Sequence, residues 1–154
     1  MSEFAEIKSR GFTLIELLVV IGIVGVLTGI AIPTYSAYIE EARNLKVMSE
    51  IKMLQEEIAD YQTNTGNLPN SLDDIGRGSL RDAWGSPYRY LNFATEHGVG
   101  NMRKDRFLVP LNTDYDLYSM GRDGKSQTPL TAASSRDDII RANNGEFIGP
   151  ASAY

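Results

Sequence analysis

The chain has 154 residues, of which 42% are hydrophobic and 23% are charged, and its formal net charge is -5. It has no cysteine, which excludes disulfide bonds and thiolate chemistry. Its basic residues are scattered and do not form a stripe with aromatic residues, so the composition predicts no nucleic-acid partner. The length suits one modest domain with a tail or an anchor.

The first element along the chain is an apolar run at 12–32, FTLIELLVVIGIVGVLTGIAI. As a helix it would extend roughly 31 Å, which is close to the hydrocarbon thickness of a bilayer. It is too long for an ordinary secretory signal, and no A-x-A-like cleavage site follows it. The simple alternative is an uncleaved anchor with Lys8 and Arg10 on the cytoplasmic side.

One carboxylate, Glu16, lies at the fifth position of this run. A charged side chain at that depth is unfavourable by ~2–3 kcal/mol or more, so an acid inside a membrane helix indicates a function and needs a partner. The alternative is a glutamate that reaches back to the membrane surface and has no further role.

The stretch Arg10–Glu16, RGFTLIE, resembles the processing site of type IV prepilins and type II secretion pseudopilins. The resemblance implies that a prepilin peptidase cuts between Gly11 and Phe12, releases the leader 1–11 and N-methylates Phe12. It also implies that Glu16 of one subunit neutralises the Phe12 amine of a neighbouring subunit. Because both charges are unfavourable when unpaired in an apolar bundle, this pairing would set the axial register of a filament.

The helical pattern continues beyond Pro33, so we expect one helix from Phe12 to about Thr63, apolar all round over 12–33 and amphipathic over 34–66. Gly66 is the expected stop. The predicted buried stripe consists of Leu45, Met48, Ile51, Leu54, Ile58 and Tyr61.

Three residues interrupt the apolar half of this helix. Gly25 and Gly29 form a small-residue pair that permits close approach of membrane helices, and Pro33 lacks a backbone donor. The family resemblance implies local unwinding between Gly25 and Pro33 in the assembled filament.

The remaining segment, 67–154, predicts a small globular domain. A helical turn is expected at 71–74, an exposed polar loop at 93–105, and short strands at 88–91, 106–109 and 116–120. An antiparallel sheet with one face on the long helix gives an α+β, pilin-like fold.

Two stretches, DAWGSPY at 82–88 and DLYSMGRDG at 116–124, resemble signatures of the major pseudopilin of type II secretion. That resemblance implies a calcium ion in the loop after the last strand. The implied ligands are the Met120 carbonyl, Asp123 and Asp138, with Asp137 as the rival of Asp138. The loop lacks the EF-hand spacing. In the alternative, a helix from Ser134 or Ser135 to Ala142 carries both later acids as first-turn charges.

Enzyme activity is not expected, because the single histidine, His97, lies in a polar stretch and no HExxH, Walker or G-x-S-x-G motif occurs. The sequence therefore predicts a structural subunit of the periplasmic pseudopilus of type II secretion. The alternative is a type IV pilin of a surface fibre for adhesion, motility or DNA uptake, although the absence of cysteine disfavours the disulfide of many such pilins. A monomeric membrane-anchored binding domain would leave Glu16 unexplained.

The resemblance also implies a location and partners for the chain. The precursor would cross the inner membrane once, with the domain at 67–154 in the periplasm, and would then join a homo-oligomeric helical filament. The expected partners are the prepilin peptidase, the inner-membrane assembly platform with its ATPase, the minor pseudopilins, and the membrane before assembly.

Overall fold

The computed structural model describes residues 11–154, so most of the predicted leader, including Lys8 and Arg10, lies outside the described residues. A single α-helix, α1, runs from Leu14 to Thr65 and includes Pro33. The chain divides into two units, one ending at Ile39 and one covering 40–154, and each is described by itself. The predicted long helix is confirmed.

The C-terminal end of α1 lies where the sequence predicts it. Gly66 adopts a φ of 80°, which favours glycine, and its N–H donates to the Gln62 carbonyl at 2.8 Å. The short helix η1, Leu72–Ile75, confirms the predicted turn at 71–74. The Ser71 and Asp74 side chains cap it reciprocally as a capping box.

The buried face of α1 confirms the predicted stripe at Ile51, Leu54 and Ile58 but not at Leu45. Val47, Ile51, Leu54 and Ile58 are fully buried, whereas Leu45 is exposed. The prediction for Leu45 was wrong because Val47, two residues later, starts the 4-3-4 spacing that faces the sheet. Met48 packs at the margin of this core.

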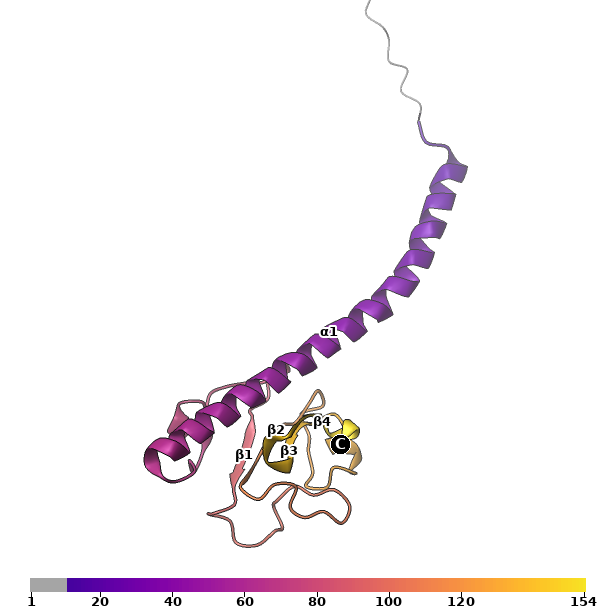
Figure 1. Ribbon diagram of the computed structural model, residues 1–154. Coiled ribbons are helices and arrows are strands. Elements are labelled where there is room, and N and C mark those ends of the chain that lie inside the picture. Colours follow the sequence, from indigo (N-terminus) through magenta and orange to yellow (C-terminus); the bar gives the residue numbers. More distant parts are fainter. Residues whose placement is uncertain (1–10) are drawn as a thin grey trace, which may run out of the picture. The chain divides into compact units, whose positions relative to one another are not determined.

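The sheet has four antiparallel strands in the order β1-β2-β3-β4 (Figure 1). Their bounds are Arg89–Asn92 for β1, Tyr115–Ser119 for β2, Ile139–Ala142 for β3 and Phe147–Pro150 for β4. The predicted strands at 88–91 and 116–120 are confirmed as β1 and β2. Strands β3 and β4 were not predicted from the sequence.

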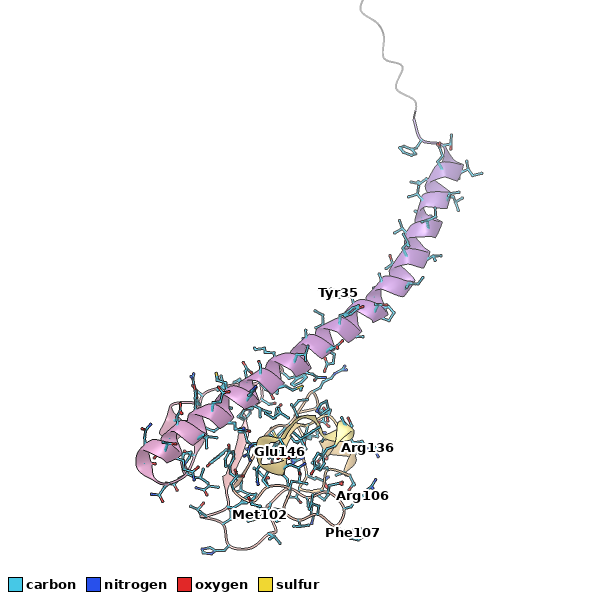
Figure 2. The ribbon with its side chains drawn as sticks, viewed as in Figure 1. Tyr35, Met102, Arg106, Phe107, Arg136 and Glu146 are labelled. Atoms are coloured by element: carbon cyan, nitrogen blue, oxygen red, sulfur yellow. The ribbon has the colours of Figure 1, made fainter. Side chains whose placement is uncertain are left out.

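The predicted strand at 106–109 is wrong. Asp105 and Leu108 exchange two backbone hydrogen bonds, of 3.1 and 2.7 Å, across a tight turn with Arg106 at a φ of 47°. Phe107 is fully exposed, and Figure 2 shows it pointing away from the sheet. The apolar triplet Phe107–Val109 has strand propensity, but no strand pairs with it beyond this turn.

The alternative helix from Ser134 or Ser135 to Ala142 is also wrong. A short helix, η2, covers only Ala133–Ser135, and the chain then enters β3. Ile139 and Ile140 are buried on opposite faces of the sheet, in two separate core clusters. A strand can bury both neighbours in this way, because successive side chains point to opposite faces.

The two faces of the sheet are covered differently. One face packs on α1 through Tyr115, Leu117 and Ile139, as predicted. The opposite face forms a second core with Leu111, Leu130 and Ala151, which come from the long connections and the C-terminal segment. The expected exposure of the loop at 93–105 is therefore correct only up to Asn101, since Met102 and Arg103 are buried.

Candidate functional site

The predicted processing site lies just before α1. Gly11 and Phe12 are exposed and outside the helix, which begins at Leu14. A Cβ atom built on Gly11 would meet no atom within 4 Å, so packing within this chain does not require a glycine there.

Glu16 has a local partner that the sequence analysis missed. Its Oε2 accepts hydrogen bonds from the Thr13 N–H and from the Thr13 hydroxyl, both at 2.8 Å. The Glu16 N–H donates to Thr13 Oγ1 at 3.3 Å. These contacts form a capping box, and the Thr-x-x-Glu spacing in the sequence would have been enough to predict it.

The helix after Glu16 presents its apolar side chains outward. Every residue from Gly11 to Ile39 is exposed. This part of α1 is long and apolar enough to cross a membrane. An exposed apolar surface of this extent requires a bilayer or other protein chains to cover it.

The predicted melting residues lie within this continuous helix. Pro33 has no N–H, so it offers no donor to the Gly29 carbonyl four residues earlier. Just after Pro33, Thr34 and Ser36 donate their hydroxyls back to the carbonyls of Ile30 and Ile32, at 3.0 and 3.1 Å. Unwinding between Gly25 and Pro33 stays a prediction.

The DAWGSPY stretch is organised by Asp82, which is 5% exposed. Its Oδ1 accepts the N–H groups of Trp84 and Ser86 at 3.0 and 2.8 Å, which shapes the turn. Its Oδ2 accepts the Ser119 hydroxyl at 2.6 Å and so ties the turn to β2. Gly85 within the turn has a φ of 92°. The stretch is a structural device that joins the connection after η1 to the sheet.

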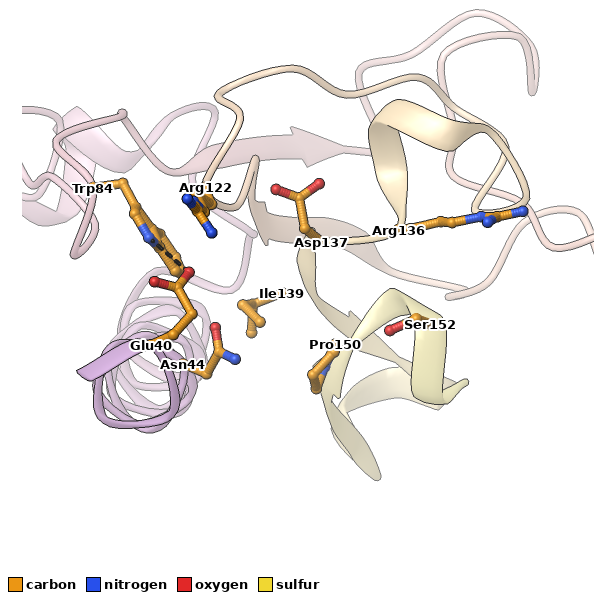
Figure 3. A pocket seen from close by; sticks show the side chains of 9 residues that line it. All are labelled: Glu40, Asn44, Trp84, Arg122, Arg136, Asp137, Ile139, Pro150 and Ser152. Carbon is orange, nitrogen blue, oxygen red and sulfur yellow. Dashed lines mark hydrogen bonds between the residues drawn. The ribbon is translucent and has the colours of Figure 1, made fainter. Parts of the chain in front are cut away.

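Trp84 lies at the edge of the core, and its Nε1 donates to Glu40 at 3.2 Å. It borders a hollow of about 400 Å³ in the C-terminal unit, which Figure 3 shows with Arg122, Arg136 and Asp137 around its rim. Trp84 is thus a residue of the core boundary.

The structure brings two of the four predicted calcium ligands, Asp123 and Asp137, together, and calcium binding stays a prediction. Asp137 Oδ2 accepts the Asp123 N–H at 3.0 Å, so these two residues are neighbours. Met120, whose carbonyl is the predicted ligand, lies close by in the chain, and its sulfur accepts from Arg89 Nε at 3.4 Å. Asp138 is 0% exposed and lies inside the domain. Among residues 11–154, no cluster of three or more Asp, Glu, His or Cys side chains could hold a metal ion.

Asp138 instead contacts Arg103, a residue that the sequence analysis left in a polar loop. The Arg103 Nη2 donates to Asp138 Oδ2 at 2.6 Å, and the Ser126 hydroxyl donates to the same oxygen at 2.6 Å. Burial raises the pKa of the Asp138 carboxyl to about 6, against the Ser126 hydrogen bond and the Arg103 charge, which lower it. No local sequence signal predicts this pair, since 35 residues separate its members.

A second buried arginine, Arg141 on β3, connects the sheet to α1. Its guanidinium donates to both oxygens of Asp114, at 2.9 and 2.8 Å, and to Gln55 Oε1 on α1 at 2.9 Å. It also lies 4.0 Å from the centre of the Tyr115 ring. These contacts fix the C-terminal half of α1 against the sheet.

Comparison with known proteins agrees with this architecture. Residues 7–32 match the family model described as the prokaryotic N-terminal methylation motif. The chain is 31% identical to the type II secretion system core protein G of Dickeya chrysanthemi, over 91% of this chain and 90% of that protein. It is also 31% identical to the protein of the same name from Escherichia coli K12, over 86% of this chain and 90% of that protein.

A type IV major fimbrial protein FimA of Dichelobacter nodosus is 33% identical over 60% of this chain and 59% of that protein. No solved structure matches the chain significantly. The likeness to core protein G covers the N-terminal motif and the sheet domain together. The chain therefore belongs to the type II secretion core protein G family of pilin-like proteins.

Proposed function

We propose that this chain is a structural subunit of the periplasmic pseudopilus of type II secretion. The observation that carries the proposal is the likeness to core protein G along 91% of the chain. The subunit would be made as an inner-membrane precursor and would assemble through α1 into a helical filament. Its contribution would be mechanical and not catalytic.

The exposed apolar half of α1 supports assembly through this helix. All residues from Gly11 to Ile39 are exposed, so the bilayer would cover this surface in the precursor and neighbouring α1 helices would cover it in the filament. Gly25 and Gly29 have no atom within 4 Å of a built Cβ, which leaves room for close approach of another helix. Local unwinding from Gly25 to Pro33 would adjust the helix as the subunit leaves the membrane.

Gly11 supports processing by a prepilin peptidase. Since the fold of the chain places no demand on this glycine, a protease that must approach the backbone closely explains the residue better than packing does. Mass spectrometry of purified filaments should find N-methyl-Phe12 as the first residue. Gly11→Val should leave the precursor uncleaved, and an intact Met1 in native filaments would contradict the processing step.

Glu16 would have one role in the single subunit and another in the filament. In the single chain its carboxylate caps α1 through Thr13. Cleavage creates an ammonium group at Phe12, and in the filament Glu16 of one copy would meet the Phe12 amine of the next. Because a mismatched register leaves both charges unpaired among apolar helices, the pairing favours one axial spacing.

A matched pair of variants separates these two roles of Glu16. Glutamine can replace glutamate in a capping box but carries no charge, so Glu16→Gln keeps the cap and removes the charge pairing. Thr13→Val removes the cap and keeps the charge. We expect both variants to insert in the membrane, Thr13→Val to form filaments and Glu16→Gln to form none. Normal filaments from Glu16→Gln would contradict the charge-pairing role.

Further partners follow from this proposal: the assembly platform and its ATPase would drive subunits into the filament, and minor pseudopilins would share it. A surface fibre is the second candidate, supported by the likeness to FimA. Deletion of the gene distinguishes the two. Loss of protein secretion with surface fibres intact would favour the pseudopilus, and loss of surface fibres with secretion intact would favour the pilus.

A further inference from the structure

Arg103 is a buried cation of the C-terminal unit. The Arg103 side chain is 2% exposed and that of Asp138 is 0% exposed, and their closest N–O distance is 2.6 Å. The second terminal nitrogen, Nη1, donates to the Ser126 hydroxyl at 2.6 Å. Arg103, Ser126 and Asp138 therefore form a closed triangle in which each member contacts the other two.

Arg103 is fixed on its other sides as well. Its backbone N–H donates to Asp116 Oδ2 on β2 at 2.7 Å, and its carbonyl accepts the Leu111 N–H at 3.0 Å. Its guanidinium carbon lies 4.1 Å from the centre of the Tyr118 ring, also on β2. The cation is thus held by the sheet on one side and by the segment 121–138 on the other.

The segment 121–138 is the one for which the family resemblance implies a calcium ion. Calcium requires six to eight oxygen ligands. Here Asp138 Oδ2 faces a guanidinium, and only its Oδ1 lacks a hydrogen-bonding partner within the described part of the chain. Asp123 and Asp137 lie together toward the surface, so the acids divide between two places. The two buried side-chain oxygens of this segment without a partner in the described part of the chain, Ser134 Oγ and Asp138 Oδ1, are far fewer than six to eight, so the donor set does not fit the ion.

We propose that the Arg103 guanidinium takes the place of the calcium ion that the resemblance implies. It holds the segment 121–138 onto the sheet, so the folded chain needs no calcium. The charge requirement of the buried carboxylate is met by the guanidinium, which is covalently part of the chain. The guanidinium of arginine is a planar fork, so its two terminal nitrogens can contact Asp138 and Ser126 separately. A spherical ion would instead need its oxygen ligands arranged around it.

Calcium dependence of thermal unfolding tests the proposal directly. Any ligand that binds only the folded state raises the midpoint of unfolding once it exceeds its dissociation constant. The full chain in detergent micelles at neutral pH should unfold at the same temperature in excess EGTA and in excess calcium chloride. A higher midpoint in calcium would overturn the proposal, and magnesium chloride at the same ionic strength controls for a general salt effect.

Substitutions test whether Arg103 supplies the missing charge. Arg103→Met keeps most of the length of the side chain, removes the cation and leaves a buried carboxylate unpaired, so the midpoint should fall by about 10 °C or more. Arg136→Met is the matched control, because it removes an exposed guanidinium from the same segment. Its midpoint should stay unchanged, and equal midpoints for the two variants would overturn the proposal.

A double variant separates charge pairing from packing. Asp138→Leu combined with Arg103→Met removes both charges, so no buried charge is left unpaired. The double variant should unfold at a higher temperature than Arg103→Met alone. If the fall in the unfolding midpoint of the double variant equals the sum of the falls caused by Arg103→Met and by Asp138→Leu, the two residues act independently and the proposal fails. The calcium comparison on the unaltered chain decides the question even if Arg103→Met does not fold.

Discussion

Asp82→Ala is the substitution whose effect the structure defines most closely. The carboxylate accepts three hydrogen bonds, from the N–H groups of Trp84 and Ser86 and from the Ser119 hydroxyl. Ser119 is fully buried and Asp82 is 5% exposed, so water cannot readily replace the lost acceptor. Alanine leaves all three donors without this partner.

The magnitude follows from the number and kind of bonds. Hydrogen bonds to charged groups contribute about 1.5–3 kcal/mol each, and neighbouring bonds are not additive, so we expect a loss of about 3–5 kcal/mol in the free energy of unfolding. With a urea m value of about 2 kcal/mol per M, the midpoint would fall by about 2 M. Such a loss is a large part of the stability of a domain this size.

The assay is urea unfolding followed by far-ultraviolet circular dichroism, since fluorescence of Trp84 would report the local turn as well as global unfolding. Asp82→Asn is the control. Its amide oxygen still accepts from Trp84 and Ser86, and its amide group can donate to Ser119 Oγ, so about 1–2 kcal/mol should be lost. A loss below about 1 kcal/mol for Asp82→Ala would refute the assignment of this carboxylate as the tie between turn and sheet.

Three further predictions test the packing and charge of the C-terminal unit. Ile51→Ala should lower the free energy of unfolding by about 3 kcal/mol in the same urea assay, because this side chain is fully buried between α1 and the sheet; a loss below about 1 kcal/mol would contradict that packing. Arg77 donates to Glu57 and lowers the pKa of that carboxyl, so the pair stabilises the fold above about pH 4.5 and loses its effect as the pH falls through the lower folded pKa. Nuclear magnetic resonance titration should show the Glu57 pKa rising in Arg77→Met, and an unchanged pKa would exclude the pair as its cause. Burial, with a hydrogen bond to Glu50, raises the pKa of Tyr88 above its usual value near 10, so its contribution is fully present below pH 10 and is lost as the pH rises further. Tyr88→Phe should unfold less steeply with pH above 10 than the unaltered chain, as followed by circular dichroism, and identical slopes would contradict this assignment.

The features predicted correctly from the sequence are those carried by a few adjacent residues. The stop at Gly66 and the capped turn at Ser71 each depend on contacts within four residues. The capping box of Thr13 and Glu16 is of the same kind and was missed although its spacing is visible. Backbone geometry and side-chain reach decide such features locally.

The fold class also followed from the sequence, because an apolar run of membrane length and an amphipathic continuation specify a long helix by period alone. The exact buried face did not. Whether Leu45 or Val47 faces inward depends on which side of α1 meets the sheet, because two residues along the helix place these side chains on nearly opposite sides.

Tertiary structure alone decided the partners of the polar residues and the strands β3 and β4. The segment 134–142 carries both a helix-start pattern and two adjacent isoleucines, and pairing with β2 and β4 selects the strand because it buries both isoleucines on opposite faces. In the same way, Asp137 and Asp138 are neighbours in the sequence, but Asp137 is half-buried whereas Asp138 is fully buried and meets Arg103 from a distant loop. Local patterns fix what a residue can do with its neighbours along the chain, whereas burial and long-range pairing determine which of those possibilities has the lowest free energy.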